Sequence, residues 1–143
     1  MNRMGKQETD KEVIVMEHEE LTRIIIGGAI SVHRALGPGF LESVYRNALA
    51  HELSKVGLEV HCEKRIQVRY DGALVGDFVA DMMIQNSVLI ENKAVQALNK
   101  AHEVQLVNYL VATQIETGLL LNFGAQSLQF RRKSRVYRAR KED

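Results

Sequence analysis

The spacing of apolar residues changes near Gly57 in this chain of 143 residues, and that change constrains the fold more than any other feature. Up to Gly57 the apolar residues recur every three or four positions, which predicts two helices, over 19–36 and about 40–56. Gly37 and Gly57 are natural helix ends. From Leu58 the spacing becomes two, as in β-strands. A chain with both patterns is expected to pack helices against a sheet.

Five strands and one further helix complete the predicted order. Strand-like segments cover 58–70, 73–84 and 87–95, and the turn signals DG and QN separate them. Helical spacing returns over 100–113, and two closing strands follow at 117–124 and 127–133. The sequence therefore predicts one α/β domain in the order ααβββαββ, with one sheet flanked by helices.

The two ends of the chain carry opposite charge. Residues 1–20 hold three basic and six acidic residues, a net charge of −3, and 1–18 is expected to be a loose acidic tail in which 13–16 could add an edge strand. Residues 131–143 hold seven basic and two acidic residues, a net charge of +5, and 134–143 is expected to be a basic tail. Such an end either attracts phosphates or is simply solvated. The candidates for nucleic-acid contact are Arg131, Arg132, Lys133 and Arg135.

The composition excludes some kinds of site and indicates where in the cell the protein is expected. Cys62 is the one cysteine, so neither an internal disulfide nor a cysteine-based zinc site can form. No apolar stretch approaches the ~20 residues of a membrane span, and the first residues lack a signal-peptide core. We expect a soluble cytoplasmic protein that does not contact a membrane.

The segment VLIENKAV (88–95) places a carboxylate and an ammonium at the end of an apolar run. Because side chains alternate along a strand, Glu91 and Lys93 share one face and Asn92 lies on the other. On the preceding strand, Asp81 is expected to share its face with Val79 and Met83. A two-residue turn would place Asp81 opposite Ile90, and a three-residue turn at 85–87 would place it opposite Glu91. We predict the three-residue turn, or a bulge with the same effect.

Two facing carboxylates repel each other, and a hard divalent cation such as Mg²⁺ removes that conflict. Lys93 could then orient a water molecule or stabilise charge on a phosphate. The alternative from spacing alone is a structural ion pair at the sheet edge.

Two helices could supply further site residues. Glu42 lies near the N3 position of the second helix, where it either caps the helix or joins the site. Glu52 is expected to pair with a basic group such as Arg65 or His33. In the third helix, His102, Gln105 and Tyr109 share a face that suits phosphate or water contacts, or simple solvation.

These residues form a pattern that is already known. GFLESVY (39–45) matches a G-x-x-E-x-x-Y signature, and further matching stretches are VHRALGPGFLESVYRNALAHEL, AD at 80–81, IENKAV, QLVNYL and GLLLNFG. From about Leu21 to Arg132 the chain resembles the GxxExxY protein family, a branch of the PD-(D/E)XK nuclease superfamily.

The resemblance implies a restriction-endonuclease-like core over 19–133, with a mixed β-sheet and helices on both faces. It assigns the metal-binding and catalytic triad to Asp81, Glu91 and Lys93, the helical acid to Glu42, and the Q-x-x-x-Y pattern to Gln105 and Tyr109. The sequence departs from the family's pattern at Ala80, where proline is nominal, and at Asn92, where an apolar residue is more usual. The side chain of Asn92 is expected to face away from the triad.

The expected function is a Mg²⁺- or Mn²⁺-dependent nuclease that acts on DNA. The metal would be held by Asp81, Glu91, the backbone carbonyl of Asn92 and Glu42. An enzyme that cuts both strands would often be a homodimer. Two alternatives stay open: a non-catalytic nucleic-acid-binding or assembly module on the same fold, and hydrolysis of another phosphate ester.

Overall fold

The computed structural model describes residues 3–135 and has the predicted order of elements. The helices are α1 (Arg3–Leu36), α2 (Glu42–Lys55) and α3 (Lys100–Thr113). The strands are β1 (Val60–Tyr70), β2 (Ala73–Ile84), β3 (Val88–Lys93), β4 (Thr117–Asn122) and β5 (Gln129–Ser134). The predictions for α3 and β2 agree with these bounds at both ends.

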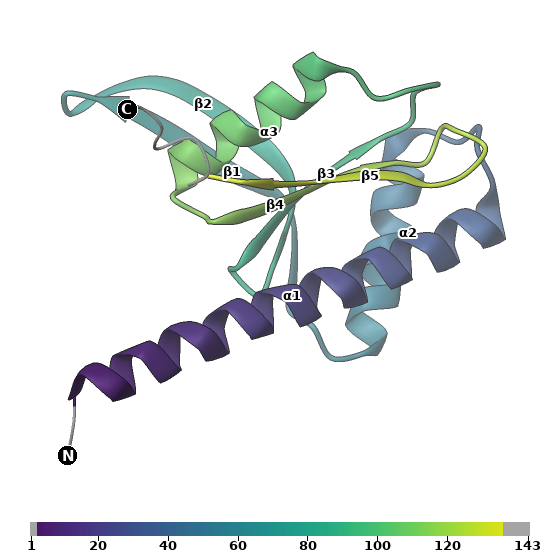
Figure 1. Ribbon diagram of the computed structural model, residues 1–143. Helices are drawn as coiled ribbons and strands as arrows, with labels where there is room; N and C mark the ends of the chain where they lie inside the picture. Colours follow the sequence, from purple (N-terminus) through teal and green to yellow (C-terminus); the bar gives the residue numbers. More distant parts are fainter. Residues whose placement is uncertain (1–2, 136–143) are drawn as a thin grey trace.

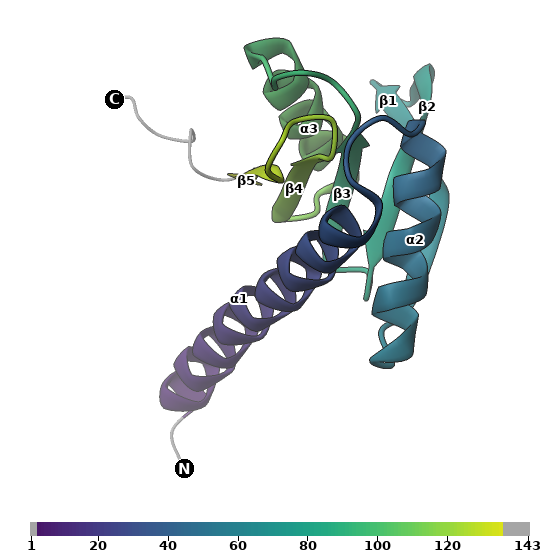
Figure 2. The ribbon, with the colours of Figure 1, turned by 90° about the vertical axis from the view of Figure 1, so that its right-hand side faces the viewer.

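The five strands form one mixed sheet in the order β1-β2-β3-β4-β5. Strands β3 and β4 are parallel and the other neighbouring pairs are antiparallel. Helices α1 and α2 cover one face of the sheet and α3 covers the other (Figure 1 and Figure 2). The predicted α/β class, with a mixed sheet flanked by helices, is confirmed.

The core consists of two apolar clusters, one on each face of the sheet. The cluster under α1 and α2 includes Ile25, Leu49 and Phe123, and the cluster under α3 includes Leu106 and Leu110. Because helices cover both faces, the central strands β3 and β4 are buried on both sides and read as nearly continuous apolar runs. Glu91 and Asn92, near the end of β3, are therefore buried rather than solvated.

Helix α1 is longer than expected. It begins at Arg3, so the predictions of a loose tail and of an edge strand at 13–16 are wrong for residues 3–18. Residues 6–26 contain neither glycine nor proline, and their many Glu, Lys and Gln residues favour a helix. The N-terminal part of α1 extends well beyond the sheet (Figure 1). Within residues 3–135, none of the helices combines the length and apolar character that a bilayer span requires.

The end of the chain is described in part. Strand β5 ends at Ser134, and the structure describes one residue beyond it. The rest of the expected basic tail, residues 136–143, lies outside the described residues.

The tyrosine of the G-x-x-E-x-x-Y signature fixes the loop between α1 and α2. Gly37 has φ +70° and its N–H donates to the His33 carbonyl at 2.8 Å, which ends α1 as predicted. The hydroxyl of Tyr45 donates to the Gly37 carbonyl at 2.5 Å and accepts from the Phe40 N–H at 3.1 Å. Tyr45 is fully buried and stacks on Phe123 at a centroid distance of 4.7 Å. This tyrosine therefore sets where α2 begins.

The turn between β2 and β3 confirms the predicted register. Met82 pairs with Ile90 and Ile84 with Val88, so the turn consists of residues 85–87. Gln85 and Asn86 have φ values of +54° and +51°. The same register, continued by one residue, would place Asp81 opposite Glu91, but the backbone pairing ends at Met82 and Ile90.

Candidate active site

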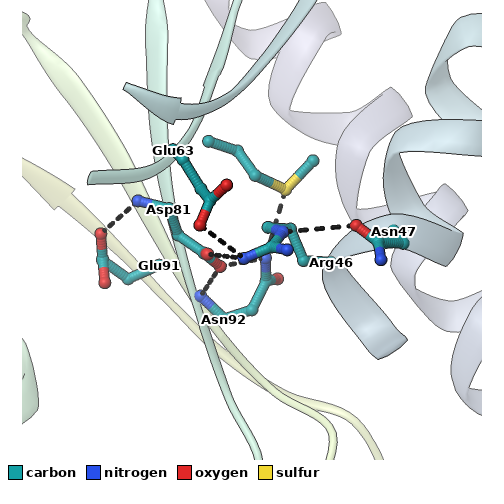
Figure 3. Close-up of polar contacts among 7 residues, drawn as sticks. Arg46, Asn47, Glu63, Asp81, Glu91 and Asn92 are labelled. Carbon is teal, nitrogen blue, oxygen red and sulfur yellow. Dashed lines mark hydrogen bonds and ion pairs between the residues drawn. The ribbon is translucent and has the colours of Figure 1, made fainter. Parts of the chain in front are cut away.

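The backbone pairing of β2 with β3 ends just before Asp81 and Glu91. There the carboxylates of these two residues accept the hydrogen bonds between the strands. The backbone ladder ends at Met82 and Ile90. Beyond it, the Asp81 N–H donates to Glu91 Oε2 at 3.0 Å, and the Asn92 N–H donates to Asp81 Oδ2 at 3.2 Å (Figure 3). Each carboxylate thus takes a backbone donor from the opposite strand. This exchange keeps the two acids close to each other at the place where the strands separate.

The two carboxylates do not point the same way. Ala80 and Met83 both lie in the cluster under α3, although residues three apart on a regular strand face opposite sides. The pairing of β1 with β2 skips Glu63, which has φ +56°, so the strands are irregular at this level. Glu91 and the Asp81 carboxylate lie on opposite sides of the Asp81 backbone (Figure 3). The prediction that Asp81 shares one face with Met83 and Glu91 is wrong.

The Asp81 carboxylate is held by groups that the sequence did not indicate. Arg46 of α2 places Nη1 3.6 Å from Asp81 Oδ1 and 3.8 Å from Glu63 Oε2. Asn92 donates from its side-chain nitrogen to Asp81 Oδ2 at 2.6 Å. Asn92 therefore does not face away from the triad, as expected above, but binds one of its members (Figure 3). Arg46 was missed, although it lies one helical turn after Glu42 and so on the same side of α2.

Glu91 is the carboxyl group with the most perturbed acidity among the described residues that show a shift. Its side chain is almost fully buried, and burial raises the pKa to about 7. The Asp81 N–H opposes this rise, the Asp81 carboxylate adds to it, and Lys93 opposes it. The Glu42 carboxylate contributes a further, smaller rise. Asp81, Lys93 and Glu42 therefore all act on Glu91 electrostatically, as expected of one site.

Glu42 lies at the start of α2 but does not cap it. It is the first residue of the helix, rather than near N3, and the helix has no side-chain hydrogen bond at its N-cap. Glu42 is exposed, so its carboxylate is free to face the site. The expected pairing of Glu52 with Arg65 or His33 is wrong, because Glu52 pairs with Lys55 at 2.9 Å.

The three polar residues predicted on one face of α3 do not all lie at the site. His102 forms a capping box with Asn99 and so serves the helix end. Tyr109 is buried, and the pKa of its hydroxyl is raised by burial and by the Glu91 carboxylate. Gln105 is exposed one turn earlier and lines the same groove as Tyr109. Gln105 and Tyr109 thus border the site on the α3 face.

The basic residues of β5 do not form one stripe. Arg131 and Lys133 both approach Glu103 of α3, at 3.8 and 2.5 Å. Arg132 lies on the other face, where it donates to the Thr22 hydroxyl at 2.6 Å. Arg135 pairs with Glu116. Alternation along the strand therefore distributes these charges over both faces of the sheet.

The donor set suits a hard divalent cation, although the side chains are not arranged around one. Asp81, Glu91 and Glu42 supply carboxylate oxygens, which Mg²⁺ and Mn²⁺ prefer. Asn92 Oδ1 is buried and accepts no hydrogen bond, which leaves an unsatisfied oxygen beside Asp81. Among the side chains that the structure describes, residues 18–135, however, no three or more His, Cys, Asp and Glu gather closely enough to hold a metal. Asp81 Oδ1 faces the Arg46 guanidinium instead.

Comparison with known proteins agrees with this geometry. A family model described as the PD-(D/E)XK nuclease superfamily matches residues 19–133. A solved chain described as the crystal structure of SSO0001 has a similar fold, with a TM-score of 0.51 and 20% sequence identity over 65% of this chain. The match spans only 50% of that solved chain, and no curated protein matches the sequence. The solved chain supports the restriction-endonuclease-like fold, and the family model, which covers most of the sequence, shows that the chain belongs to the PD-(D/E)XK nuclease superfamily.

Proposed function

We propose that the chain is a metal-dependent nuclease of the GxxExxY branch that hydrolyses phosphodiester bonds in DNA. One observation carries the proposal. In a member of a nuclease superfamily, two carboxylates exchange backbone hydrogen bonds where β2 and β3 separate, and a lysine acts electrostatically on the more buried one. Buried acids with strongly raised pKa values cluster at functional sites.

The proposed metal ligands are Asp81, Glu91, the Asn92 carbonyl and Glu42. When bound, Mg²⁺ or Mn²⁺ supplies a Lewis acid that polarises a phosphoryl oxygen and acidifies a bound water. Asp81 contributes a carboxylate only after it exchanges the Arg46 guanidinium for the ion. Glu91 contributes a group that loses its proton near pH 7, because burial makes its charged form costly without a counter-ion.

Lys93 and Tyr109 complete the proposed machinery. The ammonium of Lys93 acts on the same carboxylate as Asp81, which favours a role in orienting a water or in stabilising charge on the phosphate. Tyr109 lies on the α3 side of Glu91 and offers a hydroxyl to a substrate oxygen. Arg131, Arg132, Lys133 and Arg135 remain the proposed contacts to the nucleic-acid backbone. Pairing with acidic neighbours limits what Arg131, Lys133 and Arg135 can add.

A non-catalytic nucleic-acid-binding module is the second candidate, and a specific observation favours it. The Asp81 carboxylate is already satisfied by Arg46 and by the amide and backbone of Asn92. A structural network of this kind would hold the two strand ends in place without any cation.

A cleavage assay separates the two candidates. Purified protein is incubated with single-stranded DNA, duplex DNA and RNA, in Mg²⁺, Mn²⁺ or EDTA. The informative variants are Asp81→Asn and Lys93→Gln. The matched control is Asp77→Asn, because Asp77 lies on the same strand but is paired with Arg65 at the surface. We expect cation-dependent cleavage that falls by about 100-fold or more in both site variants and persists in the control.

Two results would count against the nuclease. One is that the wild type cleaves no substrate in either cation. The other is that Asp81→Asn or Lys93→Gln cleaves as fast as the wild type. Binding that weakens steeply with salt and survives Asp81→Asn, without any cleavage, would establish the non-catalytic module instead.

A further inference from the structure

A groove lies between α3 and the outer part of the hairpin formed by β1 and β2. Its volume is about 690 Å³, within the range of pockets that hold small organic ligands. Figure 1 shows α3 beside this hairpin. Side chains from both elements line the groove, among them Val68 and Phe78 from the hairpin and Lys100, Gln105, Asn108 and Tyr109 from α3.

The lining combines two aromatic rings, apolar side chains and polar edges. The rings of Phe78 and Tyr109 lie 5.7 Å apart at 45° to each other, and Phe78 is 43% exposed. Gln105 and Asn108 are exposed amides, which both donate and accept hydrogen bonds. A nucleobase has the matching chemistry, because its faces stack on aromatic rings and its edges bond to amides.

The groove adjoins the candidate active site through Tyr109. Tyr109 lines the groove and packs in the cluster under α3 with Ala80, which precedes Asp81, and with Leu120, which pairs with Glu91. Lys100 lines the same groove and offers a positive charge to a phosphate. A base held against Phe78 would therefore place the adjoining phosphate near Glu91.

We propose that this groove binds one nucleobase of a single-stranded nucleic acid next to the bond that is cut. The proposal rests on the proposed function and specifies its substrate: a strand whose bases are unstacked, since bases inside a duplex have no free face. Phe78 is a binding residue in this account, and Gln105 and Asn108 contact the edge of the base.

Binding in the absence of metal tests the groove without requiring cleavage. Fluorescence anisotropy is measured in EDTA with fluorescein-labelled oligothymidylate, oligouridylate and a DNA duplex. Phe78→Leu removes the ring but keeps the apolar volume, and Phe78→Tyr keeps the ring. Phe130→Leu is the matched control, because Phe130 is 42% exposed on β5 and does not line the groove. Circular dichroism establishes that each variant is folded.

We expect Phe78→Leu to weaken single-strand binding by about 5- to 150-fold, the range that one base–aromatic stack gives. Phe78→Tyr and Phe130→Leu should bind like the wild type, and the duplex should bind more weakly than either single strand. Equal binding by Phe78→Leu and the wild type would overturn the proposal, as would preference for the duplex. A dimer that Phe78→Leu dissociates would also overturn it, because a second copy would then cover the groove. If the groove binds a base but the protein cleaves nothing, the proposed nuclease is refuted and the proposal for the groove stands. If the protein cleaves DNA but Phe78 does not contribute to binding, the proposal for the groove is refuted and the nuclease stands.

Discussion

Replacement of Glu91 by glutamine should make the protein more stable at neutral and alkaline pH. Glu91 is 8% exposed and accepts the Asp81 N–H at 3.0 Å. Burial is the main reason why its pKa rises from 4.5 to about 7, and the Asp81 and Glu42 carboxylates add to it. Glutamine has nearly the same shape, keeps an acceptor oxygen and never ionises. The substitution therefore removes the cost of a buried charge with little change in packing.

The size and sign of the effect follow from proton linkage. A group with a raised carboxyl pKa binds its proton more tightly in the folded protein, so stability falls as the pH rises from about 4.5 to about 7. Below this window Glu91 is protonated in both states and the effect disappears. Above it, each pKa unit is worth 1.36 kcal/mol, and the rise from 4.5 to about 7 corresponds to about 3 kcal/mol.

Urea unfolding across the pH range measures this difference. In EDTA, Glu91→Gln should match the wild type at pH about 4 and exceed its free energy of unfolding by about 3 kcal/mol at pH about 8. Glu20→Gln is the control, since Glu20 forms an exposed pair with Arg23, and its effect should stay within about 0.5 kcal/mol at every pH. A constant difference between Glu91→Gln and the wild type, or a loss of stability at pH about 8, would refute the reasoning.

Four further substitutions test the ion pair of Asp81 with Arg46 and the packing of the fold. Arg46→Met should lower the free energy of unfolding of the metal-free protein by about 1 kcal/mol, because Asp81 loses its partner at 3.6 Å. The same substitution should tighten Mn²⁺ binding in a calorimetric titration. Unchanged Mn²⁺ affinity would contradict a competition between Arg46 and the cation for Asp81. Gly124→Ala should lower the free energy of unfolding by about 1–3 kcal/mol in a denaturant titration, because a Cβ there would lie 2.5 Å from a backbone nitrogen of the segment after β3. A Cβ at Gly27 meets nothing within 4 Å, so Gly27→Ala should stabilise α1 by about 0.5–1 kcal/mol. Equal effects of the two substitutions would refute this contrast. Tyr45→Phe should lower the free energy of unfolding by about 1–3 kcal/mol in the same assay, because the half-buried Gly37 carbonyl and the Phe40 N–H lose their partner. An unchanged stability would exclude the anchoring role.

The sequence predicts most of the fold because its local signals agree with one another. The apolar spacing identifies every strand and helix, and the residues at 85–87 set the register of β2 against β3. The N-terminal extent of α1 was missed because residues 3–18 carry no clear apolar stripe, and helix propensity alone decides their structure.

The sequence names the residues of the candidate site but does not show their arrangement. Alternation assumes a regular strand, but the pairing of β1 with β2 is irregular opposite Asp81, at Glu63. Glu63 has φ +56°, and glutamate rarely adopts positive φ, so the sequence does not indicate an irregularity there. The ion pair between Asp81 and Arg46 joins β2 to α2, so it depends on tertiary packing that spacing within one element cannot show. Asn92 does lie on the opposite face from Glu91, as predicted. It binds Asp81 because the Asp81 carboxylate lies on that face too, which the sequence did not indicate.

Calorimetric titration with Mn²⁺ tests the central claim most directly, because it asks whether Asp81 and Glu91 together hold a divalent cation. The account predicts one binding site in the wild type and in Asp77→Asn, and its loss in both Asp81→Asn and Glu91→Gln. Absence of binding to the wild type, or binding that both site variants retain, would contradict it.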